Sequence, residues 1–194
     1  MSFSNRQLPT SLKRIKLMIE LKAHPNTRAI IEAWKRLSRG DSHLIEGPMA
    51  HDYPDVVGRL FIVQRTDVED YSLRMVGAGI QELFGRELVE HNFLSLWNAT
   101  DKMVVKTAVE TAIECASPSL IRATAQTLDG KSIEIEISFS PLDTGNKERP
   151  RLLCLYQTLS DEAALKGRPI YRHFISSLYP PKPKDTGPSL RIVQ

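Results

Sequence analysis

Glu134 and Glu136 are the two carboxylates whose close spacing could suit general acid/base chemistry. They alternate with Ile133, Ile135 and Ile137, and a period of two is typical of a strand with one apolar and one polar face. Both carboxylates then point to the polar side, where solvent gives them equivalent surroundings. An acid/base pair needs surroundings that move two pKa values apart. The pattern therefore predicts a solvated sheet face rather than a catalytic pair.

The other reactive side chains form no recognisable catalytic or metal-binding pattern. Cys115 and Cys154 have neither CxxC spacing nor a histidine cluster, so we expect two reduced core thiols rather than a disulfide framework or a zinc site. The sequence has no nucleophile elbow and no HExxH helix, and the glycines at 77, 79 and 85 lack the GxGxxG spacing of a phosphate loop. We predict that the protein is not an enzyme and holds no metal.

Charge is distributed unevenly, with +4 over residues 1–26, −4 over 27–159 and +3 over 160–194. Two basic tails on an acidic centre could meet an anionic membrane, nucleic acid or an acidic partner, or could simply be solvated. The basic residues do not lie along one recognition helix, which disfavours nucleic-acid binding. A nucleic-acid-associated regulator that uses its basic tails is the alternative function.

The chain also lacks a secretion signal and any apolar stretch of about 18 residues. This predicts a cytoplasmic protein, and the basic N-terminus raises the expectation that it concentrates at a pole or membrane surface. A length of 194 residues suits one core with extensions. We divide the chain into a basic N-terminal extension (1–26), one domain with an entry helix (27–160), and a C-terminal helix with a Pro-rich tail (161–194).

Two amphipathic segments near the N-terminus could form partner or dimer surfaces. In the first, Leu12, Ile15 and Ile19 share one face if the segment is helical, and basic residues lie between them. Such a helix could dock on a protein partner, lie on an anionic lipid surface, or cover its own domain or a dimer mate. The second segment is the entry helix, which should begin with Thr27 as its N-cap and carry Ile30 and Trp34 on its apolar stripe.

The remaining pattern predicts an α+β domain in which two strands precede a helical region and three strands follow it. Strands are expected over 60–66, 71–78, 120–128, 131–140 and 151–159, with short helical pieces at 80–84 and 88–97 and a longer helix over 101–116. Asp129-Gly130 predicts a two-residue hairpin turn, because such a pair supplies the positive φ angles that a tight hairpin requires. Residues 161–178 are expected to add a last helix.

The stretch from Arg74 to Leu88, with its Gly-x-x-x-x-x-x-Phe-Gly-Arg-Glu-Leu pattern, resembles a family-level signature. Over about residues 28–160 the chain is similar to an alphaproteobacterial subgroup of stand-alone PAS domains formerly of unknown function. The subgroup has a Trp-bearing entry helix, as at Trp34, and a Pro-Leu pair near its end, as at Pro141. This sequence departs from it at Glu90, near which the subgroup has a glycine. The resemblance implies a PAS fold, whose five-stranded antiparallel sheet is flanked by short helices.

The resemblance also implies a sensory or regulatory protein that acts through a protein signalling partner, in control of motility, the cell cycle or stress, and forms a homodimer. Haem-binding relatives carry an axial histidine in the helix that matches 101–116, and flavin photosensors carry a cysteine within 80–97; both are missing here, so haem and flavin are not expected and any other cofactor is unknown. A small apolar ligand in the PAS cavity stays an open alternative to plain core packing. The residues expected to line that cavity are Met75, Phe84, Phe93, Trp97, Val105, Val109, Ile135 and Ile137.

Overall fold

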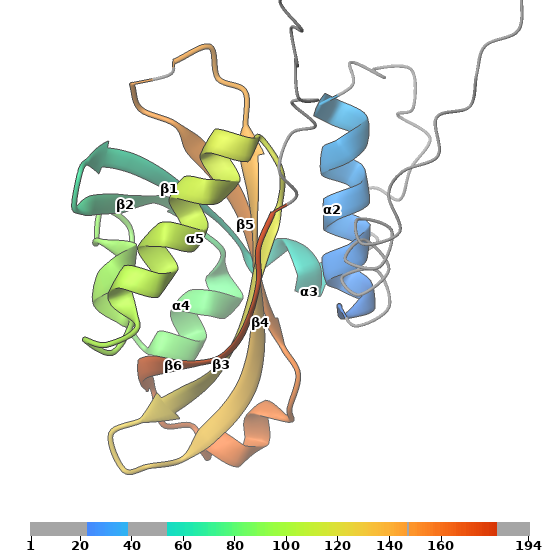
Figure 1. The fold of residues 1–194 in the computed structure, drawn as a ribbon. Helices are drawn as coiled ribbons and strands as arrows, with labels where there is room; N and C mark the ends of the chain where they lie inside the picture. Colours follow the sequence, from blue (N-terminus) through green and yellow to red (C-terminus); the bar gives the residue numbers. More distant parts are fainter. Residues whose placement is uncertain (1–22, 39–53, 147, 182–194) are drawn as a thin grey trace, which may run out of the picture.

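The computed structural model describes residues 23–38, 54–146 and 148–181, and its centre is one antiparallel sheet with helices on both faces (Figure 1). Six strands lie in the order β2-β1-β5-β4-β3-β6. The strands are β1 (Leu60–Asp67), β2 (Asp70–Val76), β3 (Ser119–Thr127), β4 (Ser132–Leu142), β5 (Arg151–Thr158) and β6 (Ile170–Tyr179). The helices are α2 (Pro25–Ser38), α3 (Pro54–Val57), α4 (Ala78–Phe84) and α5 (Lys102–Cys115), and two short 3-10 helices are η2 (Phe93–Leu96) and η3 (Glu162–Leu165). None of the helices in these ranges is long and apolar enough to cross a membrane.

The inner face of the sheet packs against α4, η2 and α5, as the alternation in β4 predicts (Figure 1). Ile133, Ile135 and Ile137 are buried on that face, and the predicted apolar stripe of α5 meets them through Val105 and Val109. Burial of these side chains stabilises the fold by roughly 25 cal/mol for each Å² of apolar surface removed from water. The expected helix over 88–97 is reduced to η2.

The hairpin between β3 and β4 is located correctly by the Asp129-Gly130 signal, but its loop has three residues rather than two. Thr127 and Lys131 close the loop through a backbone hydrogen bond of 2.9 Å, and Gly130 adopts a φ of 83°. A type I turn followed by one left-handed residue is the usual form of a three-residue hairpin.

The expected C-terminal helix over 161–178 is wrong, because the chain forms η3 and then the edge strand β6. The sheet therefore extends past residue 160, where the domain was expected to end. Register shifts in the pairing of β6 with β3 fall at Tyr171 and Ser176, and each shift inserts one extra residue. These bulges interrupt the period of two, so that the apolar residues of β6 fall at helix-like spacings. Pairing with β3 makes this segment a strand rather than a helix, since β6 supplies the hydrogen-bond partners that β3 would otherwise lack.

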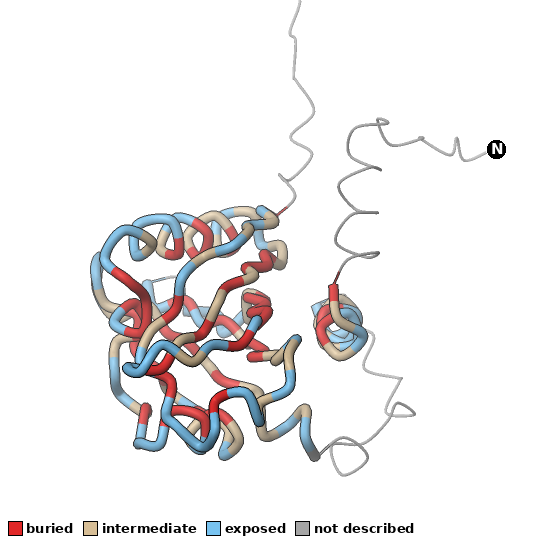
Figure 2. The backbone as a smooth tube through the Cα atoms, turned by 90° about the horizontal axis from the view of Figure 1, so that it is seen from below, coloured by how far each residue is buried: buried red, intermediate tan, exposed pale blue. Residues whose placement is uncertain are grey.

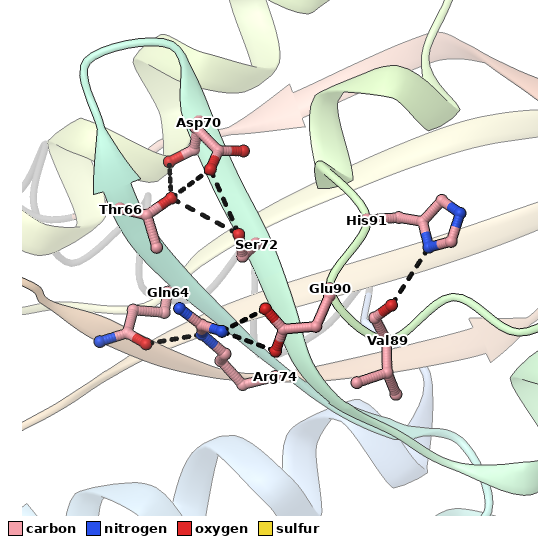
Figure 3. Close-up of polar contacts among 8 residues, drawn as sticks. All are labelled: Gln64, Thr66, Asp70, Ser72, Arg74, Val89, Glu90 and His91. Carbon is pink, nitrogen blue, oxygen red and sulfur yellow. Dashed lines mark hydrogen bonds and ion pairs between the residues drawn. The ribbon is translucent and has the colours of Figure 1, made fainter.

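At the opposite edge, strand β2 is covered by the short segment 90–92. The amide of Leu73 donates to the carbonyl of His91 at 2.9 Å, and the amide of Glu90 donates to the carbonyl of Leu73 at 2.7 Å. Glu90 has a φ of 64°, a left-handed conformation that favours glycine. Its carboxylate pairs with the guanidinium of Arg74 (Figure 3). The ion pair therefore helps to hold the chain in a conformation that the expected glycine would adopt without strain.

Helix α2 lies on the outer face of the sheet, in contact with β4 and β5, and Figure 2 shows it nearly end-on beside that face. It begins at Pro25, a residue well suited to a first helical turn, so Thr27 lies inside the helix and is buried rather than serving as the N-cap. Ile30 and Trp34 are half-buried, and the indole N–H of Trp34 donates to the carbonyl of Pro141 at 2.6 Å. Two residues expected at a partner surface thus lie on a helix that packs on its own sheet.

The prediction that Glu136 faces solvent is wrong, because α2 covers it. Its Oε1 accepts a hydrogen bond from the backbone N–H of His24 at 2.9 Å, and its Oε2 accepts one from Nε of Arg122 at 3.0 Å. Glu134, two residues earlier on the same strand, is exposed as predicted. Because His24 directly precedes α2, the buried carboxylate lies at the helix N-terminus, where the helix dipole favours a negative charge.

Replacing Glu136 with alanine should lower the free energy of unfolding by about 2 kcal/mol. The change removes the carboxylate that accepts from the His24 amide and from Nε of Arg122; the Arg122 side chain is 27% exposed, so solvent compensates for part of that loss. Urea denaturation of the two variants Glu136→Ala and Glu134→Ala measures the difference, and the control at the exposed Glu134 should change stability by less than about 0.5 kcal/mol. Equal effects of the two variants would contradict the anchoring role of Glu136.

Candidate ligand cavity

The structure brings together seven of the eight residues expected to line an interior site. They lie in one buried cluster between the inner sheet face and α4, η2 and α5, and they are Phe84, Phe93, Trp97, Val105, Val109, Ile135 and Ile137. Met75 is an exception, since its side chain is 41% exposed. It pairs with Ile62 across the β1–β2 ladder, while the neighbouring pair Phe61 and Val76 points to the core. Met75 therefore belongs to the outer face, as the alternation of a strand requires.

One pocket of about 10 Å³ lies inside this cluster. A cavity of roughly this size holds a single water molecule. Its walls are formed by Phe61, Leu73, Val76, Ile80, Phe84, Leu88, Phe93, Leu96, Tyr156 and His173. Of the residues expected to contact a ligand, Phe84 and Phe93 line this pocket, and Trp97, Val105, Val109, Ile135 and Ile137 are buried in the cluster around it.

His173 and Tyr156 are the polar side chains of this cavity, and sequence reasoning missed both. Nδ1 of His173 lies 3.0 Å from the carbonyl oxygen of Leu96, and Nε2 lies 2.9 Å from the hydroxyl oxygen of Tyr156. A carbonyl can only accept, so Nδ1 carries the hydrogen and Nε2 accepts from the Tyr156 hydroxyl. Both nitrogens are satisfied by the neutral imidazole. Had residues 170–179 been interpreted as a strand, His173 would have fallen on the inner face with Ile175.

Burial sets the ionisation of this pair. It lowers the pKa of His173 to about 4, because desolvation penalises the imidazolium more than the hydrogen bond to Leu96 favours it. It raises the pKa of the Tyr156 hydroxyl well above its ordinary value for the same reason. The rings of Trp97 and Phe84 contact the imidazole, with centroids 5.0 and 5.6 Å away. Burial therefore favours the neutral form of both groups near neutral pH.

The backbone of His173 connects the helical layer to β6. Its carbonyl oxygen accepts from the amide of Asn98 at 3.1 Å, and the amide of Ile175 donates to the carboxylate of Asp101 at 2.7 Å. Asn98 and Asp101 precede α5 directly. A displacement of the start of α5 would therefore act on β6 through hydrogen bonds as well as through the buried imidazole.

The described residues also show where the cysteines lie and which of the remaining candidate residues can be placed. In the described ranges, no three His, Cys, Asp or Glu side chains are positioned to hold a metal ion. Cys154 is a buried core thiol whose pKa is raised by burial, and Cys115 is half-buried; neither forms a disulfide. Leu12, Ile15 and Ile19 lie outside the described residues, as does most of the Pro-rich tail.

A family model described as a PAS domain matches residues 22–157. Among solved structures, the dark form of the blue-light photoreceptor Aureochrome1 LOV is 15% identical over 62% of this chain and 91% of its own, with a TM-score of 0.44. A light-oxygen-voltage domain from a study with a flavin analogue is 16% identical over 55% of this chain and 81% of its own, with a TM-score of 0.42. The Drosophila melanogaster Cycle PAS-B domain with bound glycerol is 9% identical over 51% of this chain and 99% of its own, with a TM-score of 0.41.

Comparison with curated proteins finds no match. The family model nevertheless covers more than half of the chain, and it includes the elements from α2 to β5. With the antiparallel sheet and its layer of short helices, this match shows that the chain belongs to the PAS domain family, whose members serve in sensing and signal regulation.

Proposed function

We propose that this protein is a cytoplasmic bacterial regulator that signals through contacts with a protein partner and acts as a homodimer. The observation that carries the proposal is the small size of the pocket between the sheet and the helical layer, about 10 Å³. A drug-sized ligand needs a site of roughly 300–1,000 Å³. A response based on protein contact and movement of the outer elements needs no such space. A motility, cell-cycle or stress pathway is the setting that the sequence resemblance favours.

The residues around the cavity do not fit haem or flavin in their present arrangement. His173 is the histidine that faces the cavity, and hydrogen bonds to Leu96 and Tyr156 occupy both of its nitrogens. A thiol for flavin chemistry would have to come from residues 80–97, which contain no cysteine. These features support a regulator that works without either group.

The hydrogen bonds of β6 suggest how such a regulator would pass on a signal. Binding at α5 or η2 would favour one position of the helical layer, and the contacts of Asn98 and Asp101 would transmit that preference to β6. From there it would reach the chain beyond Tyr179. A small apolar ligand remains an alternative input, provided that core side chains move to admit it. The basic tails that the nucleic-acid alternative would use lie largely outside the described residues.

Native mass spectrometry of the full-length protein, compared with its denatured mass, tests the proposal. We expect a dimer whose mass is twice that of the chain. The variant Leu12→Ser, Ile15→Ser, Ile19→Ser should be mainly monomeric, because it removes the apolar face of the N-terminal segment. Val68→Ser, at a side chain that is 69% exposed in the β1–β2 turn, is the control and should stay dimeric. A retained compound that shifts the methyl NMR signals of the buried Ile135 would contradict signalling without a cavity ligand, and a monomeric wild type would contradict the homodimer.

A further inference from the structure

A surface groove of about 450 Å³ lies at the end of the molecule where three elements meet. Its walls come from the end of α4, the β3–β4 turn and the start of β6, which lie close together in Figure 1. The segment Arg168 to Tyr171 forms one side and lies beyond residue 157, where the family match ends. The groove is therefore a feature that the C-terminal part of this chain adds to the domain.

Large apolar side chains line the groove and remain open to water. Leu128 is 79% exposed and Tyr171 is 49% exposed, although each is large enough to be buried at a considerable gain in free energy. Phe84 and Ile170 are buried and also line the groove. An occupant with an aromatic or aliphatic body would cover all four side chains.

Two guanidinium groups give the groove a positive rim. Arg86 is exposed, and in the described ranges no ion pair is seen for it. Arg168 is 68% exposed, and the Asp129 carboxylate approaches it only to 4.0 Å. Asp129 also lines the groove, but one of its oxygens accepts a hydrogen bond from Thr127. The lining thus carries one net positive charge: Arg86 is available to an oxyanion, and Arg168 has only the long, exposed ion pair with Asp129, which an oxyanion could replace.

We propose that this groove binds a small organic anion whose acidic group pairs with Arg86 and Arg168 and whose apolar body covers Leu128 and Tyr171. The volume is within the usual range for small-molecule sites, and apolar walls with a few charged groups are their usual chemistry. Such a ligand would also contact a residue of the core. Phe84 lines the groove, and its ring centroid lies 5.6 Å from that of His173. The groove and the interior pocket share Phe84 alone among their lining residues, and the proposal does not depend on the proposed dimer.

Fluorescence titration of the full-length protein with 1-anilinonaphthalene-8-sulfonate tests the proposal, with its neutral analogue N-phenyl-1-naphthylamine as the matched probe. We expect saturable binding of the sulfonate that weakens about tenfold or more in the variant Arg86→Gln, Arg168→Gln, since two charge-assisted contacts are lost. The variant Arg36→Gln, Arg149→Gln removes two exposed arginines elsewhere and should bind the sulfonate as the wild type does. Methyl NMR should show the Leu128 signals shifting on titration while those of Ile135 stay in place.

Three results would overturn the proposal. Equal affinities for the charged and the neutral probe would show that the arginines play no part. Equal weakening in both double variants would indicate nonspecific attraction to net positive charge. Shifts at Ile135 without shifts at Leu128 would place the probe in the interior instead of in the groove.

Discussion

Lowering the pH from 7 to 4 should reduce the free energy of unfolding by about 3 kcal/mol through His173 alone. The unfolded chain gains a proton at this histidine as the pH falls through its ordinary value of 6.5, whereas the buried imidazole resists protonation down to about 4. Between these two values the unfolded state binds more protons, so acid favours unfolding. The loss of stability therefore begins as the pH falls through the unfolded pKa of 6.5, and it levels off once the pH is below the folded pKa of about 4.

The contacts around the imidazole likewise predict that acid destabilises the folded protein. Protonation would add a hydrogen at Nε2, where the hydroxyl of Tyr156 donates a hydrogen bond to the neutral ring. The rings of Trp97 and Phe84, which pack on the imidazole, carry no charge to compensate an imidazolium. The Tyr156 hydroxyl stays neutral throughout this range, because burial raises its pKa.

Urea denaturation of the wild type and of His173→Gln at half-unit steps between pH 4 and pH 7.5 measures this effect. Other titrating groups contribute equally to the stability curves of the wild type and the variant. The difference between the two curves therefore gives the contribution of His173. We expect the wild type to lose about 3 kcal/mol more than the variant over the range. Parallel curves would mean that His173 is protonated as easily in the folded protein as in the unfolded chain.

Replacing Gly77 with alanine should destabilise the fold by about 3 kcal/mol. A Cβ at this position would lie 2.3 Å from the carbonyl oxygen of Gly58 and 3.0 Å from that of Leu60. Both are backbone atoms and cannot turn away as a side chain would. The φ of Gly77 is −65°, which any residue adopts, so the cost arises from the close approach of the two chain segments alone.

Thermal and urea denaturation of Gly77→Ala, compared with Gly145→Ala, measure this effect. Gly145 has a φ of 70° but open space around its Cβ position, so its variant should lose only about 1 kcal/mol from backbone strain. A loss at Gly77 no larger than that at Gly145 would mean that the start of α4 can move away from the 58–60 segment. The comparison separates steric contact from backbone conformation.

The sequence by itself predicted the entry helix α2, the strands β1 to β5 and the helices α4 and α5, since each has a local signal of its own. It did not predict the short helix α3, and it overestimated the length of η2. The alternation around Ile135 marks a strand, the Asp129-Gly130 pair marks a turn, and the periodicity around Val109 marks a helix. The same patterns identified most of the buried cluster, because a side chain's place on an inner face depends on the period of its own element. The family resemblance was drawn from residues in these well-marked elements.

Tertiary structure alone decided β6, the burial of Glu136 and the polar part of the cavity. Bulges at Tyr171 and Ser176 shift the strand period, and such shifts depend on pairing with β3, a strand far away in the sequence. Glu136 has the pattern of a solvated residue, and only the docking of α2 on that face buries it. His173 reaches the core because β6 joins the sheet. The local sequence predicts which residues share a face of a helix or strand. Whether solvent reaches that face depends on its contacts with elements that are distant in the sequence.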